Sequence, residues 1–101
     1  MARQQLTDGS GKWFDLATAT AWEEKTHWDG SNHISLATGS QWNHEVLYRT
    51  GGGRFILHKW SQWQGRPSTF EEISGNTGWD WLIRNEYFDA VPEEKLKARE
   101  V

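Results

Sequence analysis

The stretch at residues 42–63, WNHEVLYRTGGGRFILHKWSQW, contains the strongest structural signal in this chain. Two segments within it, 42–50 and 54–63, alternate apolar and polar side chains as β-strands do. Three glycines, Gly51 to Gly53, separate the two segments, and glycine supplies the positive φ angles that tight hairpin turns require. We therefore predict an antiparallel β-hairpin here.

Opposite charges indicate how the two strands of this hairpin pair. A three-residue glycine loop places Thr50 opposite Arg54. The same register places Glu45 opposite Lys59, and cross-strand pairs of opposite charge are favourable. In this register apolar side chains gather on one face of the sheet, and aromatic, imidazole and amide side chains gather on the other. The predicted core face carries Ile34, Leu36, Leu47, Phe55 and Leu57.

Further elements are expected on both sides of the hairpin. A third strand is predicted at residues 33–38, joined to the hairpin by a turn at Gly39 and Ser40, so that the three strands form an antiparallel meander. A helix is predicted over residues 16–26, with Asp15 as its N-cap, because small and apolar residues alternate there with charged ones at helical spacing.

A second helix over residues 77–87 is expected to pack on the sheet, because its apolar side chains recur at helical spacing. Residues 68–73 fit either a short strand or one helical turn, and both alternatives stay open. We predict an α+β fold with one domain over residues 13–90. A flexible N-terminus at 1–12 and a charged tail at 91–101, with the potential to form a helix, are expected to flank it.

Eight tryptophans in 101 residues are the most unusual feature of the composition. Indoles at this density argue against disorder and predict a compact chain. We assign three of them to packing around the helices, namely Trp13, Trp22 and Trp79. Two others, Trp28 and Trp81, are left unassigned.

The second face of the predicted sheet is the candidate binding face. Its strand positions mix indole, phenol, imidazole and amide groups. Tryptophan, tyrosine and arginine are the residue types that contribute most to the centres of protein interfaces. The candidate binding residues are Trp42, His44, Tyr48, His58, Trp60, Gln62, Trp63 and Arg66.

Charge and composition argue against several classes of function. The net charge is -3 and the eleven lysines and arginines are scattered, so duplex DNA is not expected as a partner. The sequence contains no apolar run long enough to cross a membrane, so no membrane partner is expected. It also contains no cysteine, and its N-terminal segment lacks the apolar stretch of a secretory signal. We therefore expect a cytoplasmic protein.

No motif in the sequence predicts catalysis. His33, His44 and His58 share the candidate binding face but lack the spacing typical of metal ligands. Ser35 is not accompanied by a nucleophile elbow, and the glycine loop lacks the lysine of a phosphate-binding loop. We expect no catalytic residues, no metal and no cofactor.

These observations lead to three hypotheses about function. The first is a small protein-binding or regulatory accessory module, inhibitor-like or antitoxin-like, that docks on another protein through the aromatic face. The same face would suit a homodimer. The second is a ligand-binding domain that stacks sugars or single-stranded nucleobases on its tryptophans. The third is a histidine-based, metal-dependent enzyme.

Overall fold

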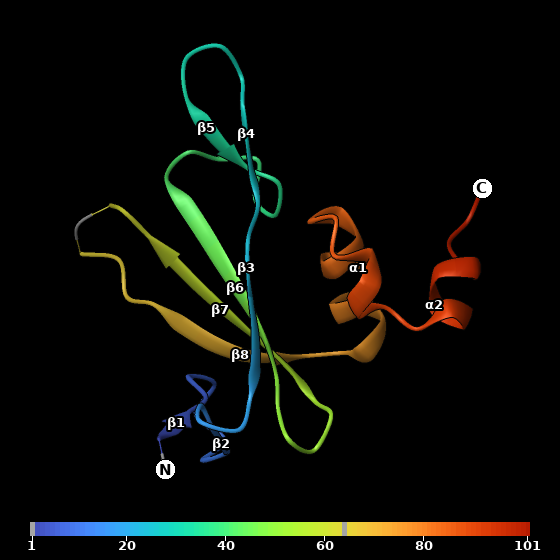
Figure 1. Cartoon of the computed structure of the whole chain (residues 1–101). Coiled ribbons are helices and arrows are strands. Elements are labelled where there is room, and N and C mark those ends of the chain that lie inside the picture. The colour runs from blue at the N-terminus through green and yellow to red at the C-terminus, as the bar shows by residue number, and fades with distance from the viewer. Residues whose placement is uncertain (1, 64) are drawn as a thin grey trace.

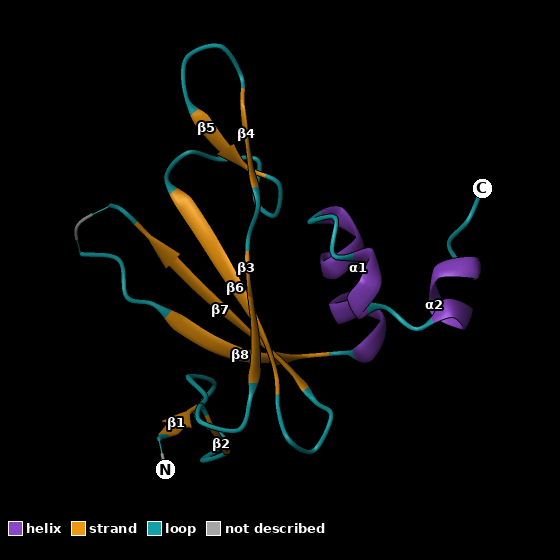
Figure 2. Cartoon of the chain, viewed as in Figure 1, coloured by secondary structure: helices purple, strands orange, loops and turns teal. Residues whose placement is uncertain are grey.

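The protein is mainly β. The computed structural model describes residues 2–63 and 65–101, and these contain eight strands, two α-helices and one short 3-10 helix (Figures 1 and 2). The strands are β1 (Arg3–Gln5), β2 (Trp13–Asp15), β3 (Thr20–Glu23), β4 (Thr26–Trp28), β5 (His33–Ser35), β6 (Asn43–Arg49), β7 (Phe55–Ser61) and β8 (Thr69–Ile73). The helices are α1 (Gly75–Arg84), η1 (Phe88–Ala90) and α2 (Glu93–Lys97). The predicted α+β class is therefore wrong.

A four-stranded antiparallel sheet, in the order β3-β6-β7-β8, forms the centre of the molecule. Strands β6 and β7 are the hairpin predicted at residues 42–63, and Glu45 lies opposite Lys59 as expected. The backbone N–H of Thr50 donates to the carbonyl oxygen of Arg54 at 2.8 Å and closes the glycine turn. The register and the turn of this hairpin are thus confirmed.

The helix predicted over residues 16–26 does not form. Asp15 caps a turn instead, because its Oδ1 accepts a hydrogen bond from the backbone N–H of Ala17 at 2.9 Å. The chain then continues as β3, which pairs with β6 through Trp22 opposite Leu47. An aspartate before small residues suits a tight turn as well as a helix start, and pairing with a strand distant in sequence favours the turn here.

The predicted three-stranded meander is also wrong. Residues 33–38 contain β5, but β5 pairs with β4 in a separate hairpin in which His27 lies opposite Ile34. This hairpin extends beyond the end of the central sheet (Figure 1). The place beside β6 belongs to β3, and the segment left open at 68–73 contains the edge strand β8.

The helices cover one face of the central sheet, which we call the helix face (Figure 1). Helix α1, predicted over residues 77–87, begins two residues earlier because Ser74 caps it and accepts a hydrogen bond from the N–H of Thr77. Its packing on the sheet is confirmed. The main core consists of Leu47, Phe55, Leu57, Trp79, Trp81, Leu82 and Val91. Ile34 and Leu36 were predicted on the same sheet face as Leu47, but Ile34 lies in β5 of the separate β4–β5 hairpin and Leu36 directly follows that strand.

The N-terminal hairpin β1–β2 covers part of the opposite face, which we call the hairpin face (Figure 2). Residues 1–12 were expected to be flexible, but apart from Met1, which lies outside the described residues, they contain β1 and the buried Leu6. Leu6 forms a second core with Phe14 and Ile56. The central sheet is therefore enclosed by the helices on one side and, in part, by the hairpin on the other.

The charged C-terminal segment contains α2, which follows Pro92. Leu96 of this helix packs against the main core, and Arg99 forms an ion pair with Asp80 of α1. These contacts attach the segment to the body of the protein. No helix in the described part of the chain combines the length and the apolar character that crossing a membrane requires.

Candidate functional site

Three exposed indoles, Trp42, Trp60 and Trp63, define the candidate site, and we call them the tryptophan cluster. They lie where β6 begins and β7 ends, with exposed fractions of 42%, 39% and 54%. The ring centroids of Trp42 and Trp63 are 5.2 Å apart. Because His44 pairs with Trp60 across the strands, Trp42 is the diagonal neighbour of Trp60, within reach of large side chains. The three indoles therefore form one surface.

A buried pair formed by the carboxylate of Glu24 and the imidazole of His44 lies next to this surface and packs against Trp60. The imidazole of His44 stacks on Trp60 with 4.4 Å between ring centroids. Its Nδ1 donates to Glu24 Oε1 at 3.0 Å, and the backbone N–H of Glu45 donates to the same oxygen at 2.7 Å. Only 15% of the His44 side chain and 9% of the Glu24 side chain are exposed. The pair fixes the imidazole, and through it the orientation of Trp60.

Arg66 lies beside the tryptophan cluster, because its backbone N–H donates to the carbonyl oxygen of Trp63 at 3.4 Å. Arg66 also lines a shallow pocket of about 330 Å³ together with Trp60 and Pro67. Lys59 lines the same pocket from the opposite face of the sheet, where it forms an ion pair with Glu71 at 3.6 Å. Arginine beside tryptophan is the composition typical of the centre of a protein interface. Most of the predicted binding residues therefore gather at this end of the sheet, namely Trp42, His44, Trp60, Gln62, Trp63 and Arg66.

Tyr48 and His58, also predicted as binding residues, lie further along the hairpin face. Tyr48 packs against Phe14 of the N-terminal hairpin, with 5.4 Å between ring centroids. His58 stacks face to face on Phe70 at 4.1 Å. Both are half-buried. The predicted register placed both residues on the correct face of the sheet, but the N-terminal hairpin β1–β2, which covers part of this face, was not predicted.

His58 is expected to make the fold sensitive to acid. Burial lowers the pKa of His58 below the ordinary value, because desolvation disfavours the imidazolium. Between this lowered pKa and about 6.5, the unfolded chain binds more protons at this residue, so the free energy of unfolding falls as the pH falls. We expect His58→Phe, which keeps the stack on Phe70, to lose less stability than the wild type between about pH 7.5 and about pH 5. Urea unfolding at both pH values measures this, and equal losses would contradict it.

The remaining tryptophans divide between core and surface. Trp22, Trp79 and Trp81 pack in the main core, which confirms the prediction for the first two. Trp13, also assigned to packing, is 53% exposed, so that assignment is wrong. Side chains alternate along β2, and Phe14 takes the inward position. Trp28 is 60% exposed in the β4–β5 hairpin.

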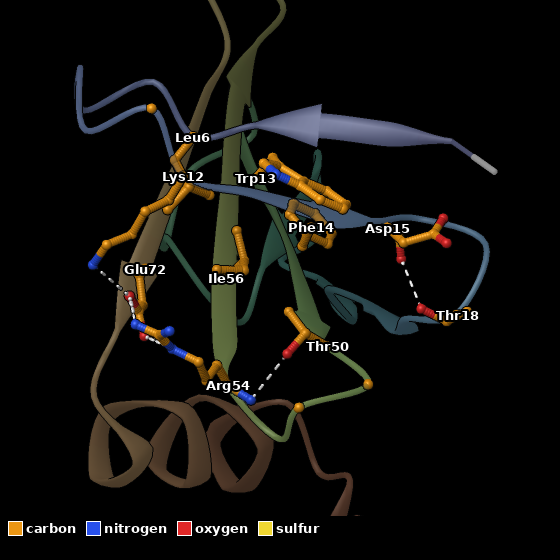
Figure 3. Close-up of a pocket in the computed structure, with 13 residues that line it drawn as sticks. Leu6, Lys12, Trp13, Phe14, Asp15, Thr18, Thr50, Arg54, Ile56 and Glu72 are labelled. Carbon is orange, nitrogen blue, oxygen red and sulfur yellow. Dashed lines mark hydrogen bonds and ion pairs between the residues drawn. The ribbon is translucent and has the colours of Figure 1, made fainter.

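A second concave site lies at the other end of β6 and β7, between the N-terminal hairpin and the glycine turn. This pocket has a volume of about 500 Å³. Trp13 and Phe14 lie on one side of it, Arg54 and Thr50 lie on the other, and Ile56 lies between them (Figure 3). It was missed in the sequence because three separate segments meet to form it, and one of them belongs to a hairpin that was not predicted.

The described residues contain no group of three or more His, Cys, Asp or Glu side chains placed to hold a metal ion. Comparison with known proteins finds no matching family model, no similar curated protein and no similar solved structure. The function has to be inferred from the tryptophan cluster and the pocket themselves.

Proposed function

We propose that this protein is a regulatory protein-binding module that docks on a partner protein through the tryptophan cluster. The observation that supports this most strongly is the joint exposure of Trp42, Trp60 and Trp63 at one end of the sheet. Folded monomers rarely leave large aromatic side chains exposed together unless those side chains contact something. Tryptophan is also the residue type that most often dominates binding energy, because it removes a large apolar area from water.

The tryptophan cluster is held in place before any partner binds. His44 supports Trp60, and Trp42 contacts Trp63. Side chains that are already fixed lose little conformational entropy on binding, so more of the buried area appears as affinity. Arg66 beside the cluster would bind carbonyl or carboxylate groups of the partner.

An inhibitor-like or antitoxin-like accessory role fits a small acidic domain with one such surface. We propose that it acts in the cytoplasm, because a chain without cysteine needs no oxidising compartment. In this role the tryptophan cluster would cover a functional surface of the larger partner protein. The acidic net charge of -3 would favour approach to a basic partner.

Trp63→Ala tests this function with little risk to the fold, because Trp63 is 54% exposed. The wild-type protein first captures its partner from the source cells, and the complex is then reconstituted from the two purified proteins. We expect Trp63→Ala to weaken the Kd measured by titration calorimetry by roughly 30-fold or more, as loss of an interface hot spot of about 2 kcal/mol does.

The matched control is Trp28→Ala, which removes an indole of similar exposure from the β4–β5 hairpin. This variant should bind the partner as the wild type does. Equal affinities for Trp63→Ala and the wild type would contradict the proposed function. So would the failure to recover any complex of defined stoichiometry.

A further inference from the structure

The pocket at the glycine turn has the dimensions and the lining of a small-molecule site. Its volume of about 500 Å³ lies within the range of roughly 300–1,000 Å³ that ligand pockets occupy. Its floor is formed by Leu6, Phe14 and Ile56 of the second core, and polar groups surround that floor (Figure 3). It lies at the end of β6 and β7 that is remote from the tryptophan cluster, so it is independent of the proposed function.

The charges around this pocket balance. Arg54 donates from Nε and Nη2 to the two carboxylate oxygens of Glu72 at 2.6 and 2.7 Å, and Lys12 Nζ lies 3.7 Å from the same carboxylate. The Arg54 guanidinium holds the pKa of Glu72 below its usual value, and the N–H of Ala17 does the same for the pKa of Asp15. Two cations and two carboxylates leave no net charge, which favours a neutral ligand over a phosphate.

Hydrogen-bonding groups of both kinds border the floor of the pocket. The side chain of Asp15 points away from the pocket, where its Oδ1 accepts from the N–H of Ala17 at 2.9 Å, so the polar border comes from the neighbouring threonines (Figure 3). Thr50 Oγ1 accepts from the N–H of Arg54 at 3.1 Å, so its hydroxyl hydrogen is free to donate. Thr18 donates to the carbonyl oxygen of Asp15 at 3.3 Å and keeps its lone pairs for accepting. Ligand hydroxyl groups, which both donate and accept, match this arrangement.

We infer that this pocket binds a neutral saccharide ring. Such a ring has apolar C–H faces and a hydroxylated edge, as the apolar floor and the polar border require. Trp13 lines the pocket with 53% of its surface exposed and offers an indole for the C–H face. The guanidinium of Arg3 lies 5.1 Å from the centre of the indole and steadies it. The hydroxyl groups of Thr18 and Thr50 then bind the hydroxyls of the sugar.

The test is a titration of the whole chain, labelled with ¹⁵N, with D-glucose, D-galactose, D-mannose and N-acetyl-D-glucosamine. At least one of these sugars should cause saturable shifts at the amides of Trp13, Gly51 and Gly52, with no change at Trp63. We expect Trp13→Ala to weaken this binding by about tenfold or more. Trp63→Ala should leave it unchanged, which separates this site from the tryptophan cluster.

A second variant keeps the test decisive if Trp13→Ala disturbs the hairpin. Thr18→Val removes a hydroxyl from the border of the pocket but keeps the shape of the side chain, and it should also weaken sugar binding several-fold. Inorganic phosphate and adenosine are the competing probes. The inference is overturned if none of the sugars binds saturably. It is also overturned if phosphate or adenosine binds here more tightly than every sugar, or if neither variant changes the affinity.

Discussion

Gly78→Ala should destabilise the protein by about 2–3 kcal/mol, although alanine is normally the better helix former. Gly78 is buried in α1, where the helix lies against the sheet. A Cβ at this position would lie 2.5 Å from Cγ and Cδ2 of Phe55, which is far inside van der Waals contact. Phe55 is only 2% exposed and packs edge-on against Trp79 at 4.8 Å, so its ring has little room to move. The clash therefore outweighs the gain of about 1 kcal/mol in helix propensity.

Gly75→Ala is the matched control on the same helix. A Cβ at Gly75 meets no atom closer than 4.0 Å, so helix propensity should decide and the variant should be as stable as the wild type or slightly more stable. Urea unfolding of both variants measures the difference. If Gly78→Ala were as stable as Gly75→Ala, the close packing of α1 on β7 would be wrong.

Asn85→Asp should cost about 3 kcal/mol or more at neutral pH, since it places a charge where no water reaches. Asn85 is fully buried at the end of α1. Its Oδ1 accepts from the N–H of Lys25 at 3.0 Å, and its Nδ2 donates to the carbonyl oxygen of Trp81 at 2.9 Å. The aspartate carboxylate can still accept the hydrogen bond from the N–H of Lys25. Its second oxygen, however, faces the carbonyl oxygen of Trp81, and two acceptors repel each other. Asn85 thus connects the helix to the chain between β3 and β4.

The loss of stability caused by Asn85→Asp should become smaller at acidic pH, because a protonated carboxyl group can again donate a hydrogen bond to the Trp81 carbonyl oxygen. Urea unfolding at neutral and at acidic pH measures this. Asn76→Asp, an exposed change in the first turn of α1, should be neutral or slightly favourable, since a negative charge suits a helix N-terminus. Similar stabilities for the two variants would refute the role assigned to Asn85.

The parts of the fold that were predictable depend on local signals. The glycine turn and the Glu45–Lys59 pair lie within one hairpin, and they were sufficient to derive its register. The pairing of β3 with β6 and of β4 with β5 depends on contacts between segments, and Asp15 suits a turn as well as a helix start. The helical interpretation of residues 16–26 failed for that reason.

One further sequence signal would have helped. Residues 8–18 and 29–38 both begin with Asp-Gly-Ser and end with Leu-Ala-Thr. In each segment the aspartate side chain accepts from the serine N–H two residues later, at 2.9 and 2.8 Å, and forms the turn of a two-stranded hairpin. This repeat indicates two similar hairpins, each followed by a tight turn and a strand of the central sheet.

The tryptophan cluster was predictable because it lies on the β6–β7 hairpin, whose register was predicted. Trp42, Trp60 and Trp63 follow from the register of β6 and β7. Glu24, whose carboxylate holds the imidazole of His44, was missed because residues 16–26 were predicted to form a helix and not a strand beside β6. The pocket beside Trp13 was missed because its hairpin was not predicted.

Hydroxyl-radical footprinting of the complex with its protein partner tests the central claim most directly, because the exposed tryptophans act as internal probes. Free protein should be oxidised at five exposed indoles, namely Trp13, Trp28, Trp42, Trp60 and Trp63. We predict that the partner protects Trp42, Trp60 and Trp63 and leaves Trp13 and Trp28 as reactive as before. Protection of Trp13 or Trp28, with the tryptophan cluster still reactive, would contradict the account.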